Sequence, residues 1–394
     1  MATATPSRIQ RLLEPGDHGP LPLLDATGLV DVAEAAGLTG RGGAGFPSAI
    51  KLRGVMNGGR RPAVVGNAME GEPLSHKDAV LLTRNPGLVI DGLELVSRAL
   101  RAGRVVLAVG PEIDPGPALA EVRRRGSAVE VRQLSGGFVA GQETALLNQL
   151  EGRPAVPRDP LIRITEQGLD GRPTLVQNAE TLAHLALAAR HGAAWFRAAG
   201  LPDDPGTSLF TITGAVASPG VVEAERGTSL RAVLAPSGPS ENAIAVLVGG
   251  YHGAWVPVDG LDVSLTRAAL APYGATVGAG VLHVLDASTC PLEASARIAG
   301  YLAGESAGQC GPCINGLPRI ADSLARLARM ERDPRLPVEI DRLQRLVTGR
   351  GACAHPDGTA RMVGSTLRSF APHVEAHLAG WCPSARPSAR ENAS

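Results

Sequence analysis

The first residues of this 394-residue chain that could bind a ligand lie in a glycine-rich segment with one arginine, Gly40-Arg41-Gly42-Gly43-Ala44-Gly45-Phe46-Pro47. Four glycines in six positions exclude a core helix or strand, because glycine adopts positive φ at little cost and lets a ligand approach the backbone. Successive amide N–H groups in such a loop can converge on an anion, and the arginine adds a fixed positive charge. The segment is therefore typical of a cradle for a phosphate or a flavin, or alternatively of a solvent-exposed turn.

The cysteines form a second set of reactive residues: Cys290, Cys310, Cys313, Cys353 and Cys382. An odd number in a long chain argues against a disulfide framework and favours metal binding or redox use. Cys310 and Cys313 have the C-x2-C spacing of metal ligands, and Cys353 follows about forty residues later. Cys290 precedes a proline and is interpreted as a buried small hydrophobic residue. Cys382 has no partner that the sequence indicates.

The composition limits the class of protein. The 38 basic and 38 acidic residues balance, so no single-sign field points to nucleic acid or an anionic membrane as a partner. Residues 1–19 lack the basic-then-apolar layout of a signal peptide, and no apolar run reaches membrane-spanning length. We therefore expect a cytoplasmic protein without direct membrane insertion.

The elements that position these residues alternate between strands and helices in the first half of the chain. Short apolar strands are predicted over residues 63–66, 105–109 and 129–134, and helices over 29–36, 86–101 and 117–125. Such alternation implies a parallel sheet in a Rossmann-like layout. Polar residues directly after the first strand, over 67–73, lie where α/β sheets bind ligands.

The remaining segments predict further units. A second glycine-containing turn over 136–142 opens a helix whose amides could face an anion, and residues 173–181 enter another helix. Alternation from about residue 206 predicts a small strand-rich domain, and helical patterns over 320–330, 337–347 and 364–378 predict a C-terminal bundle. The expected organisation is a flexible N-terminus (1–24), an α/β domain (25–205), a strand-rich domain (206–286), a helical domain (287–383) and a disordered tail (384–394).

Five motifs in order resemble one family, the NADH-binding flavoprotein subunit of respiratory NADH:quinone oxidoreductase (complex I) and its relatives in NAD-linked hydrogenases and formate dehydrogenases. They are residues 40–47 with Lys51, 67–73 with Lys77-Asp78, 141–152, 173–181 and 305–353. The resemblance covers about residues 25–383. It implies an α/β Rossmann-like FMN domain, then a small β-grasp domain like the soluble-ligand-binding (SLBB) module, then a helical bundle with an iron–sulfur motif.

The resemblance also implies a function. The chain would be an NADH dehydrogenase-like, FMN-dependent subunit that moves electrons from NADH or another donor through FMN and a [4Fe-4S] cluster. The acceptor would be a small iron–sulfur protein, ferredoxin-like or a thioredoxin-like [2Fe-2S] subunit, and any membrane link would come through another subunit. Two alternatives stay open: an electron-relay or assembly subunit without NADH oxidation, and a ligand-binding module with decayed redox sites.

Matching the motifs residue by residue assigns the flavin site. The phosphate and the ring edge would be held by Gly40, Arg41, Gly42, Gly43 and Lys51, and Gly45 and Phe46 of the same loop are further expected cofactor-binding residues. The rest of the site would be lined by Asn67, Glu70, Phe138, Gly141, Glu143, Gln177, Asn178 and Thr181. Glu70 and Glu143 are the two expected catalytic residues.

The chemistry of these residue types agrees with the assignment. A lysine ammonium is a mobile point charge suited to phosphate, and amide side chains donate and accept at once, as flavin carbonyls and nitrogens require. Taken without the family, Asn178 is more typical of a helix N-cap, Glu180 of a first-turn carboxylate and Phe138 of core packing.

The cysteine motif departs from the family pattern, C-x2-C-x2-C with a fourth cysteine roughly forty residues later. Ala307 stands in the place of the first ligand, and an alanine cannot ligate iron. Three outcomes follow: a [4Fe-4S] cluster on three thiolates, a three-iron cluster, or no cluster with a vestigial pair, a zinc site or a disulfide instead. The three metal ligands would be Cys310, Cys313 and Cys353. The candidates for the fourth position are water, Ser306, His355 and Cys290.

The nicotinamide site departs from the family as well. Met69 stands where the family has an aspartate, and Gln142 replaces the first of two paired glutamates. Phe46 is the survivor of an aromatic clamp for adenine, and Arg158 is the nearest counterpart of a family lysine. Stacking contributes on the order of 1–3 kcal/mol per base, so NAD(H) is expected as a more weakly bound substrate.

Overall fold

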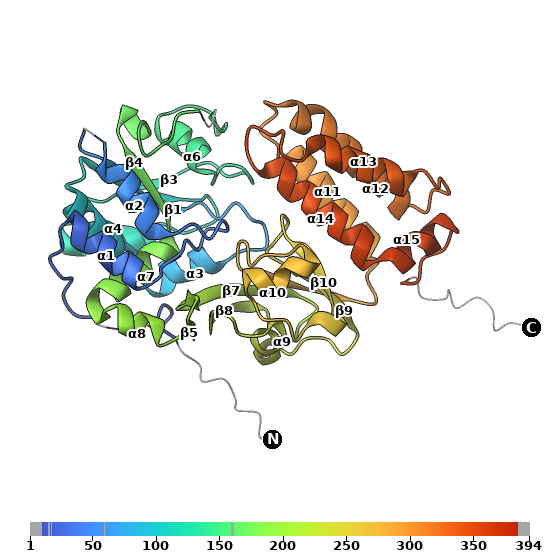
Figure 1. Ribbon diagram of the computed structural model, residues 1–394, viewed down its shortest axis with the longest axis horizontal. Helices are drawn as coiled ribbons and strands as arrows, with labels where there is room; N and C mark the ends of the chain where they lie inside the picture. Colours follow the sequence, from blue (N-terminus) through green and yellow to red (C-terminus); the bar gives the residue numbers. More distant parts are fainter. Residues whose placement is uncertain (1–9, 15, 17, 59, 159–160, 385–394) are drawn as a thin grey trace, which may run out of the picture.

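The computed structural model describes residues 10–14, 16, 18–58, 60–158 and 161–384. The N-terminus expected to be flexible (1–24) lies partly outside these ranges, and the tail expected to be disordered (384–394) lies almost wholly outside them. Figure 1 shows three lobes in chain order: an α/β lobe in blue to green, a strand-rich lobe in olive to yellow, and a helical lobe in orange to red. Among the described residues, none of the helices combines the length and apolar character that crossing a membrane requires.

A four-stranded parallel sheet in the order β3-β2-β1-β4 forms the centre of the α/β lobe. β1 (Ala63–Ala68) lies between β2 (Arg104–Val109) and β4 (Thr174–Asn178), and β3 (Glu130–Gln133) pairs with β2. β1 and β2 are nearly continuous apolar runs, as parallel strands buried on both faces require. The predicted α/β class with a parallel sheet is confirmed. The sequence interpretation missed β4, taking its residues only as the entry to a helix.

Helices cover both faces of this sheet. One face packs against α1 (Ala26–Ala35), α2 (Ser48–Met56), α4 (Pro86–Leu100) and α7 (Ala179–His191), and the other against α6 (Glu143–Leu150). The side chains alternate accordingly: Val64 and Leu175 belong to the first core, Val65 and Val176 to the second. The lobe is completed by α3 (Lys77–Arg84), α5 (Gly116–Arg125) and α8 (Ala193–Arg197).

The strand-rich lobe is a mixed five-stranded sheet in the order β10-β9-β11-β7-β8. Its strands are β7 (Thr207–Gly214), β8 (Gly220–Glu225), β9 (Ala243–Val248), β10 (Ala254–Pro257) and β11 (Val281–Asp286). β7 and β11 run parallel and the other pairs antiparallel. The short helices α9 (Leu230–Leu234) and α10 (Arg267–Leu270) pack on the sheet, and a small ribbon of β5 (Gly200–Leu201) and β6 (Asp204–Pro205) precedes it.

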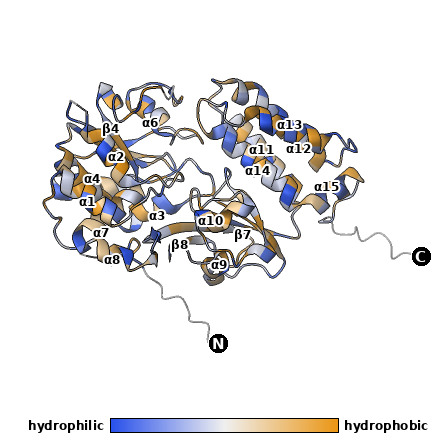
Figure 2. Cartoon of the chain, viewed as in Figure 1, coloured by the Kyte–Doolittle hydropathy of each residue, from blue (hydrophilic) through white to orange (hydrophobic). Residues whose placement is uncertain are grey.

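The helical lobe consists of α11 (Pro291–Gly304), α12 (Leu317–Ala328), α13 (Leu336–Val347), α14 (His355–Ser369) and α15 (Ala371–Leu378). α12 and α13 each carry hydrophobic and hydrophilic residues on different sides (Figure 2), and their apolar residues join one core. The sequence predicted a single helix over 364–378, which is wrong. The chain breaks at Phe370, whose ring packs edge-on against Trp255 of β10 with centroids 5.5 Å apart.

Candidate functional site

The carboxyl ends of β1 and β4 form the topological switch point of the parallel sheet. The chain continues from β1 to β2 and β3 on one side, whereas β4 lies on the other side of β1. Open α/β sheets bind ligands in the crevice at such a point. Asn67 and Asn178 are register partners at this edge, and Asn178 Nδ2 donates to the Asn67 carbonyl at 3.3 Å. The structure thus brings together two residues that the sequence assigned to one site.

The glycine-rich loop lies directly beside this edge. The amide of Arg41 donates to Thr181 Oγ1 on α7 at 2.8 Å, and a Cβ at Gly42 would lie 3.3 Å from the Asn178 Cβ. Gly43 and Gly45 have φ of +113° and +63°, which residues with a side chain rarely adopt. The loop is therefore a backbone platform fixed to α7, as a phosphate cradle requires.

The Arg41 guanidinium does not point freely into a phosphate site. It is buried and donates to the carbonyls of Thr39, Pro205 and Thr207 at 2.7, 3.3 and 3.1 Å. Burial, followed by the charge of Arg226, lowers the pKa of Arg41 to about 9. The side chain therefore fastens the loop to the strand-rich lobe. Arg41 can then contribute to a phosphate site through its backbone amide and its charge, and not through a direct contact of its guanidinium.

Lys51 and Glu143, both predicted in the flavin site, form an ion pair between α2 and α6. Their side chains are 24% and 38% exposed, and Lys51 Nζ also donates to the Val176 carbonyl at 3.3 Å. Gln142 is the N-cap of α6, and its Oε1 accepts hydrogen bonds from two amides of the first turn. Gln142, which replaces a family glutamate, therefore caps the first turn of α6.

Glu70, expected to be catalytic, caps the start of α3. Its Oε1 accepts from the Ser75 hydroxyl at 2.7 Å and the Asp78 amide at 2.9 Å, and its Oε2 accepts from the Ala79 amide at 3.0 Å. Burial, followed by the charge of Asp78, raises the pKa of Glu70. Its backbone φ is +44°, which a non-glycine residue adopts only where its surroundings impose it. A catalytic role for Glu70 stays a prediction, and this cap would coexist with it.

Two side chains, one near the end of β1 and one just after it, tie the site to neighbouring turns. Asn67 Nδ2 donates to the Gly141 carbonyl at 2.9 Å. Glu72 accepts from the Tyr251 amide of the strand-rich lobe at 2.8 Å, and burial raises the pKa of Glu72 to about 7. The sequence interpretation did not assign Glu72 a role. The predicted residues Asn67 and Gly141 are in direct contact.

Lys77, which the sequence placed in a family motif without a role of its own, is the centre of a buried charge network. Lys77 Nζ lies 2.7 Å from Asp78 Oδ1, 3.0 Å from Glu180 Oε2 and 3.3 Å from Asn178 Oδ1. Burial alone lowers the pKa of Lys77, but Asp78 and Glu180 outweigh it and the pKa is raised. Asn178 Oδ1 also accepts from the Glu180 amide at 3.0 Å, which confirms that Asn178 is the N-cap of α7. The available signal was the adjacent Lys77-Asp78 in a segment that is otherwise largely apolar.

Gln177 provides a test of whether the site fits a flavin. The residue is 4% exposed, and its Nε2 has no hydrogen-bond partner within the part of the chain that the structure describes. Leaving a buried donor unpaired costs about 1–3 kcal/mol, so such an atom points to a partner supplied by a ligand. An amide donor next to the Asn178 strand end suits a flavin carbonyl or ring nitrogen. The residues at this edge therefore fit FMN.

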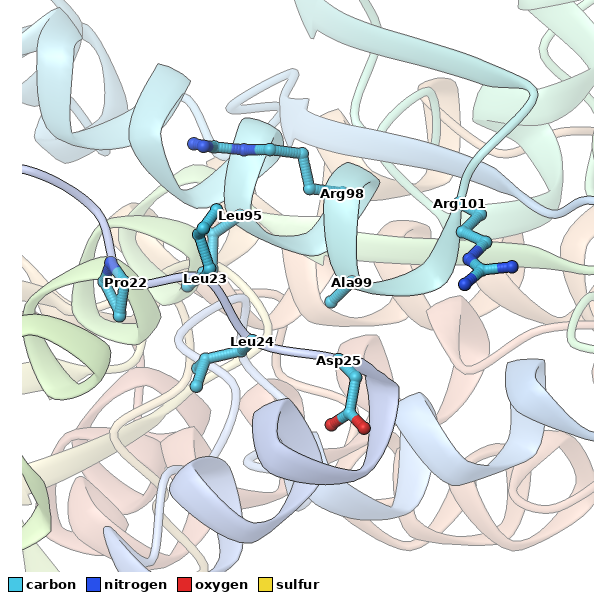
Figure 3. Close-up of a pocket in the computed structure, with 8 residues that line it drawn as sticks. All are labelled: Pro22, Leu23, Leu24, Asp25, Leu95, Arg98, Ala99 and Arg101. Atoms are coloured by element: carbon cyan, nitrogen blue, oxygen red, sulfur yellow. The ribbon is translucent and has the colours of Figure 1, made fainter.

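Two cavities lie near the α/β lobe. One, of about 500 Å³, opens between the glycine-rich loop and the strand-rich lobe, and Gly40, Gly43 and Gly45 line it. The other, of about 350 Å³, lies between residues 22–25 and the end of α4 (Figure 3). Arg101 in its wall lies just before β2, so this second cavity is at the amino ends of the strands. The first cavity is the one that adjoins the predicted phosphate cradle.

Phe138 connects the flavin side to the helical lobe. Its amide donates to Glu305 Oε2 at 2.9 Å, and its ring packs edge-on against His252 with centroids 4.5 Å apart. The ring also lies 5.5 Å from that of His355 and joins the core of the helical lobe. The core-packing interpretation of Phe138 is therefore confirmed. Since Glu305 begins the cysteine loop, Phe138 lies between that loop and the Gly141 turn.

The three cysteines predicted as metal ligands meet beyond the end of α11. Cys310 and Cys313 flank the start of a π-helical turn (Pro312–Gly316), and Cys353 precedes α14. Burial, a hydrogen bond with Cys310 and the charges of Cys310 and Cys353 raise the pKa of Cys313 to about 12. The thiols of Cys310 and Cys353 therefore act on Cys313, and the Ser306 hydroxyl, which lowers its pKa, lies near it as well. Cysteine thiolates are the ligand type that iron–sulfur clusters take.

The structure narrows the candidates for a fourth ligand. Both ring nitrogens of His355 are engaged, Nδ1 with His252 at 3.1 Å and Nε2 with the Leu302 carbonyl at 2.8 Å. Cys290 as fourth ligand is wrong, because the 14 residues of α11, about 21 Å of helix, separate it from the cysteine loop. Of the three side chains considered, Ser306 is the one that acts on the pKa of Cys313.

Cys290 and Cys382 have neighbours that the sequence did not indicate. Cys290, expected to be a buried small hydrophobic residue, is partly buried and packs against the helical core, and its Sγ lies 3.5 Å from His377 Nε2. Cys382, for which no partner was evident, belongs to the same cluster of side chains. His377 and Cys382 are five residues apart, but Cys290 lies 87 residues before His377, so the sequence alone does not link the three.

Comparisons with known proteins agree with this geometry. The family profile described as the Nuo51 FMN-binding domain matches residues 33–187, and that of the NADH-ubiquinone oxidoreductase-F iron-sulfur binding region matches residues 293–377. The F 2 subunit of NADH-quinone oxidoreductase from Rhizobium meliloti is 30% identical over 372 residues, covering 89% of this chain and 88% of the relative. The F subunit of the same enzyme from Streptomyces coelicolor is 32% identical over 382 residues, covering 90% and 84%.

A solved structure resembles the whole arrangement. An NAD+-reducing [NiFe]-hydrogenase in the air-oxidized state superposes with a TM-score of 0.83 at 31% identity, over 91% of this chain. The present chain spans 64% of the length of that hydrogenase chain.

Proposed function

This chain belongs to the family of F subunits of NADH-quinone oxidoreductase, and on that premise we propose that it is an FMN-dependent, NADH dehydrogenase-like oxidoreductase subunit. It takes electrons from NADH and passes them to iron–sulfur centres. When bound, FMN accepts the two electrons of a hydride and releases them singly. The observation that carries the proposal is the convergence of Asn67, Asn178 and the unpaired Gln177 amide at the switch point of the sheet.

The flavin phosphate is assigned to the backbone of residues 40–45 together with Lys51. The Arg41–Thr181 hydrogen bond supports this assignment, because it fixes the loop against α7. The ring edge is assigned to the amide side chains of Asn67, Gln177 and Asn178. Glu70 and Glu143 are retained as the catalytic candidates, and Phe138 and Gly141 as the wall facing the helical lobe.

The helical lobe is proposed to hold an iron–sulfur cluster on Cys310, Cys313 and Cys353, with Ser306 or water at the fourth position. Such a cluster supplies one-electron transfer. The position of Phe138 between the Gly141 turn and Glu305 supports a short route between the two cofactor sites. The electron acceptor would be a small iron–sulfur protein, ferredoxin-like or a thioredoxin-like [2Fe-2S] subunit.

The remaining assignments follow the family. The mixed sheet over 206–286 is proposed to be the SLBB-like β-grasp domain, because its parallel β7–β11 pair lies within an otherwise antiparallel sheet. The α/β domain over 25–205 and the helical domain over 287–383 flank it. A cytoplasmic location, with any membrane link through another subunit, stays a prediction.

An anaerobic absorption spectrum with and without NADH tests the proposal. The purified chain should show flavin absorbance that NADH bleaches, and iron analysis should find iron bound. A colourless protein with neither flavin nor iron would overturn the proposal and favour a ligand-binding module with decayed redox sites.

A relay or assembly subunit without NADH oxidation is the second candidate, and the nicotinamide side of the site favours it. Met69 is buried and apolar, and Glu143 is paired with Lys51 instead of standing free. Flavin absorbance that dithionite bleaches and NADH does not would identify this alternative.

A further inference from the structure

Cys290, His377 and Cys382 form a compact cluster at the end of the helical lobe opposite the cysteine loop. One donor atom from each residue lies within 4.8 Å of the other two. Cys290 is the N-cap of α11, His377 lies in the last turn of α15, and Cys382 follows that helix. Donors from the start of α11 and from the end of α15 therefore converge at one point.

The imidazole of His377 is held in one tautomer by its surroundings. The residue is 1% exposed, and its Nδ1 lies 3.1 Å from the Leu327 carbonyl at the end of α12. A carbonyl only accepts, so Nδ1 carries the proton and the lone pair of Nε2 is left toward Cys290. Histidines that ligate metals usually donate their second ring N–H to a carbonyl or carboxylate in this way, which fixes their orientation.

The spacing of the donors matches a tetrahedral metal. A Zn–S bond of about 2.3 Å and a Zn–N bond of about 2.0–2.1 Å at the tetrahedral angle place sulfur and nitrogen about 3.6 Å apart. The observed separation of Cys290 Sγ and His377 Nε2 is 3.5 Å. Two thiolates would also balance the charge of a divalent ion, which a half-buried site requires.

We propose that Cys290, His377 and Cys382 bind a zinc ion through two thiolates and one imidazole, with a fourth position open to water. Thiolate and imidazole donors favour zinc over magnesium, calcium or manganese. The ion would clip the C-terminal segment to the start of α11, where Ser384 Oγ already approaches the Thr289 carbonyl at 3.5 Å. This site shares no residue with the flavin site or with Cys310, Cys313 and Cys353.

Zinc content of the full chain tests the proposal. The protein is purified under reductant, stripped with a chelator, reloaded with zinc and gel-filtered before elemental analysis. The wild type should retain about one zinc ion per chain at this site. Cys290→Ser and Cys382→Ser should lose that ion, whereas a Cys310→Ser/Cys313→Ser variant should keep it. Loss with the Cys310 and Cys313 replacements alone, or no retained zinc in the wild type, would overturn the proposal.

A pair of histidines on α15 supplies a matched control. His373 lies one turn before His377 and contacts Ser384 through Nε2 at 3.4 Å. His377→Gln should lower zinc affinity at least tenfold, and His373→Gln should leave it unchanged. Circular dichroism and flavin content of each variant verify that the fold is intact, and equal zinc loss in both histidine variants would count against the assigned ligand.

Cobalt(II) provides a readout on the unmutated chain that does not depend on how the variants fold. Addition of Co2+ to the metal-free protein should produce a thiolate-to-cobalt charge-transfer band that zinc abolishes. Peptide mapping after alkylation examines the competing state, a disulfide between Cys290 and Cys382. Finding that disulfide under reductant, with no cobalt band, would exclude the zinc site.

Discussion

The ammonium of Lys51 and the carboxylate of Glu143 form an ion pair between α2 and α6. Under the proposed function both residues belong to the flavin site, and each is the partner of the other. Because both side chains are partly exposed, such a pair contributes on the order of 1 kcal/mol or less. A flavin phosphate with its greater negative charge can therefore displace Glu143 from Lys51.

Replacing Lys51 tests whether this residue contacts the phosphate of FMN or its ring. Lys51→Met should weaken FMN binding by about tenfold or more, because a hydrogen bond to a charged group contributes about 1.5–3 kcal/mol. Riboflavin lacks the phosphate, so its affinity should hardly change. Fluorescence titration of the flavin-free protein with both ligands measures the difference. In Glu143→Gln, where the competing charge is gone, FMN should bind as well or better. Unchanged FMN affinity in Lys51→Met would remove Lys51 from the site.

Under the proposed function, we expect Phe46 to stack on a ring of the dinucleotide. It lies at the end of the glycine-rich loop and is 45% exposed, and nearby Ile50 is 51% exposed. Stacking contributes about 1–3 kcal/mol per base, so Phe46→Ala should raise KM for NADH roughly ten- to a hundredfold without loss of FMN. Ile50→Ala is the control for lost apolar area, since it removes a neighbouring exposed side chain that cannot stack. Equal effects of the two variants on KM would refute stacking by Phe46.

Local sequence patterns predict the elements that contain their own apolar repeat. α4, β1 and β2 are of this kind, and the polar residues that follow β1 lie at the carboxyl edge of the sheet, where the sequence placed them. β4 was missed because it has only five residues and ends in Gln177 and Asn178, so its strand character depends on pairing with β1.

Local sequence patterns do not predict contacts between segments that are distant in the chain. Glu70 is a cap only because α3 begins beside it, and the Lys51–Glu143 pair depends on how α2 and α6 meet. Cys290 and His377 are 87 residues apart in the chain, so only the packed bundle brings them together.

Glu223 should make the stability of the folded chain depend on pH. Its carboxylate accepts from the Leu12 amide at 2.8 Å and the Thr207 hydroxyl at 2.5 Å, and burial raises the pKa of Glu223 from 4.5 to about 7. The folded state therefore binds this proton more tightly than the unfolded state. The contribution of Glu223 to the free energy of unfolding should then fall as pH rises from about 4.5 to about 7.

Glu223→Gln isolates this effect because glutamine stays neutral at every pH. The difference in unfolding free energy between variant and wild type should shift in favour of the variant by about 2–3 kcal/mol between pH 5 and pH 8. Urea denaturation of both proteins at intervals over that range measures the shift. A difference that is constant with pH would show that Glu223 ionises normally in the folded chain.

Ala307 is the position at which a single substitution should change the cluster. It stands in the place of the first cysteine of the family motif and follows Ser306, which acts on the pKa of Cys313, so a thiol at this position should supply the missing fourth ligand. Ala307→Cys should raise iron and acid-labile sulfide toward four of each per chain and lengthen the lifetime of the cluster in air several-fold. Gln309→Cys places an extra thiol on the same loop at an exposed position and should do neither.

Combining Ser306→Ala with Ala307→Cys identifies the fourth ligand of the cluster in the unmodified protein. If the Ser306 hydroxyl completes the site, Ser306→Ala should lower bound iron in the wild-type background and have no effect once Ala307→Cys is present. If water completes it, Ser306→Ala should leave the iron content unchanged in both backgrounds. A gain of iron in Gln309→Cys equal to that in Ala307→Cys would contradict the assignment of residue 307 as the vacant ligand position, because any added thiol would then serve.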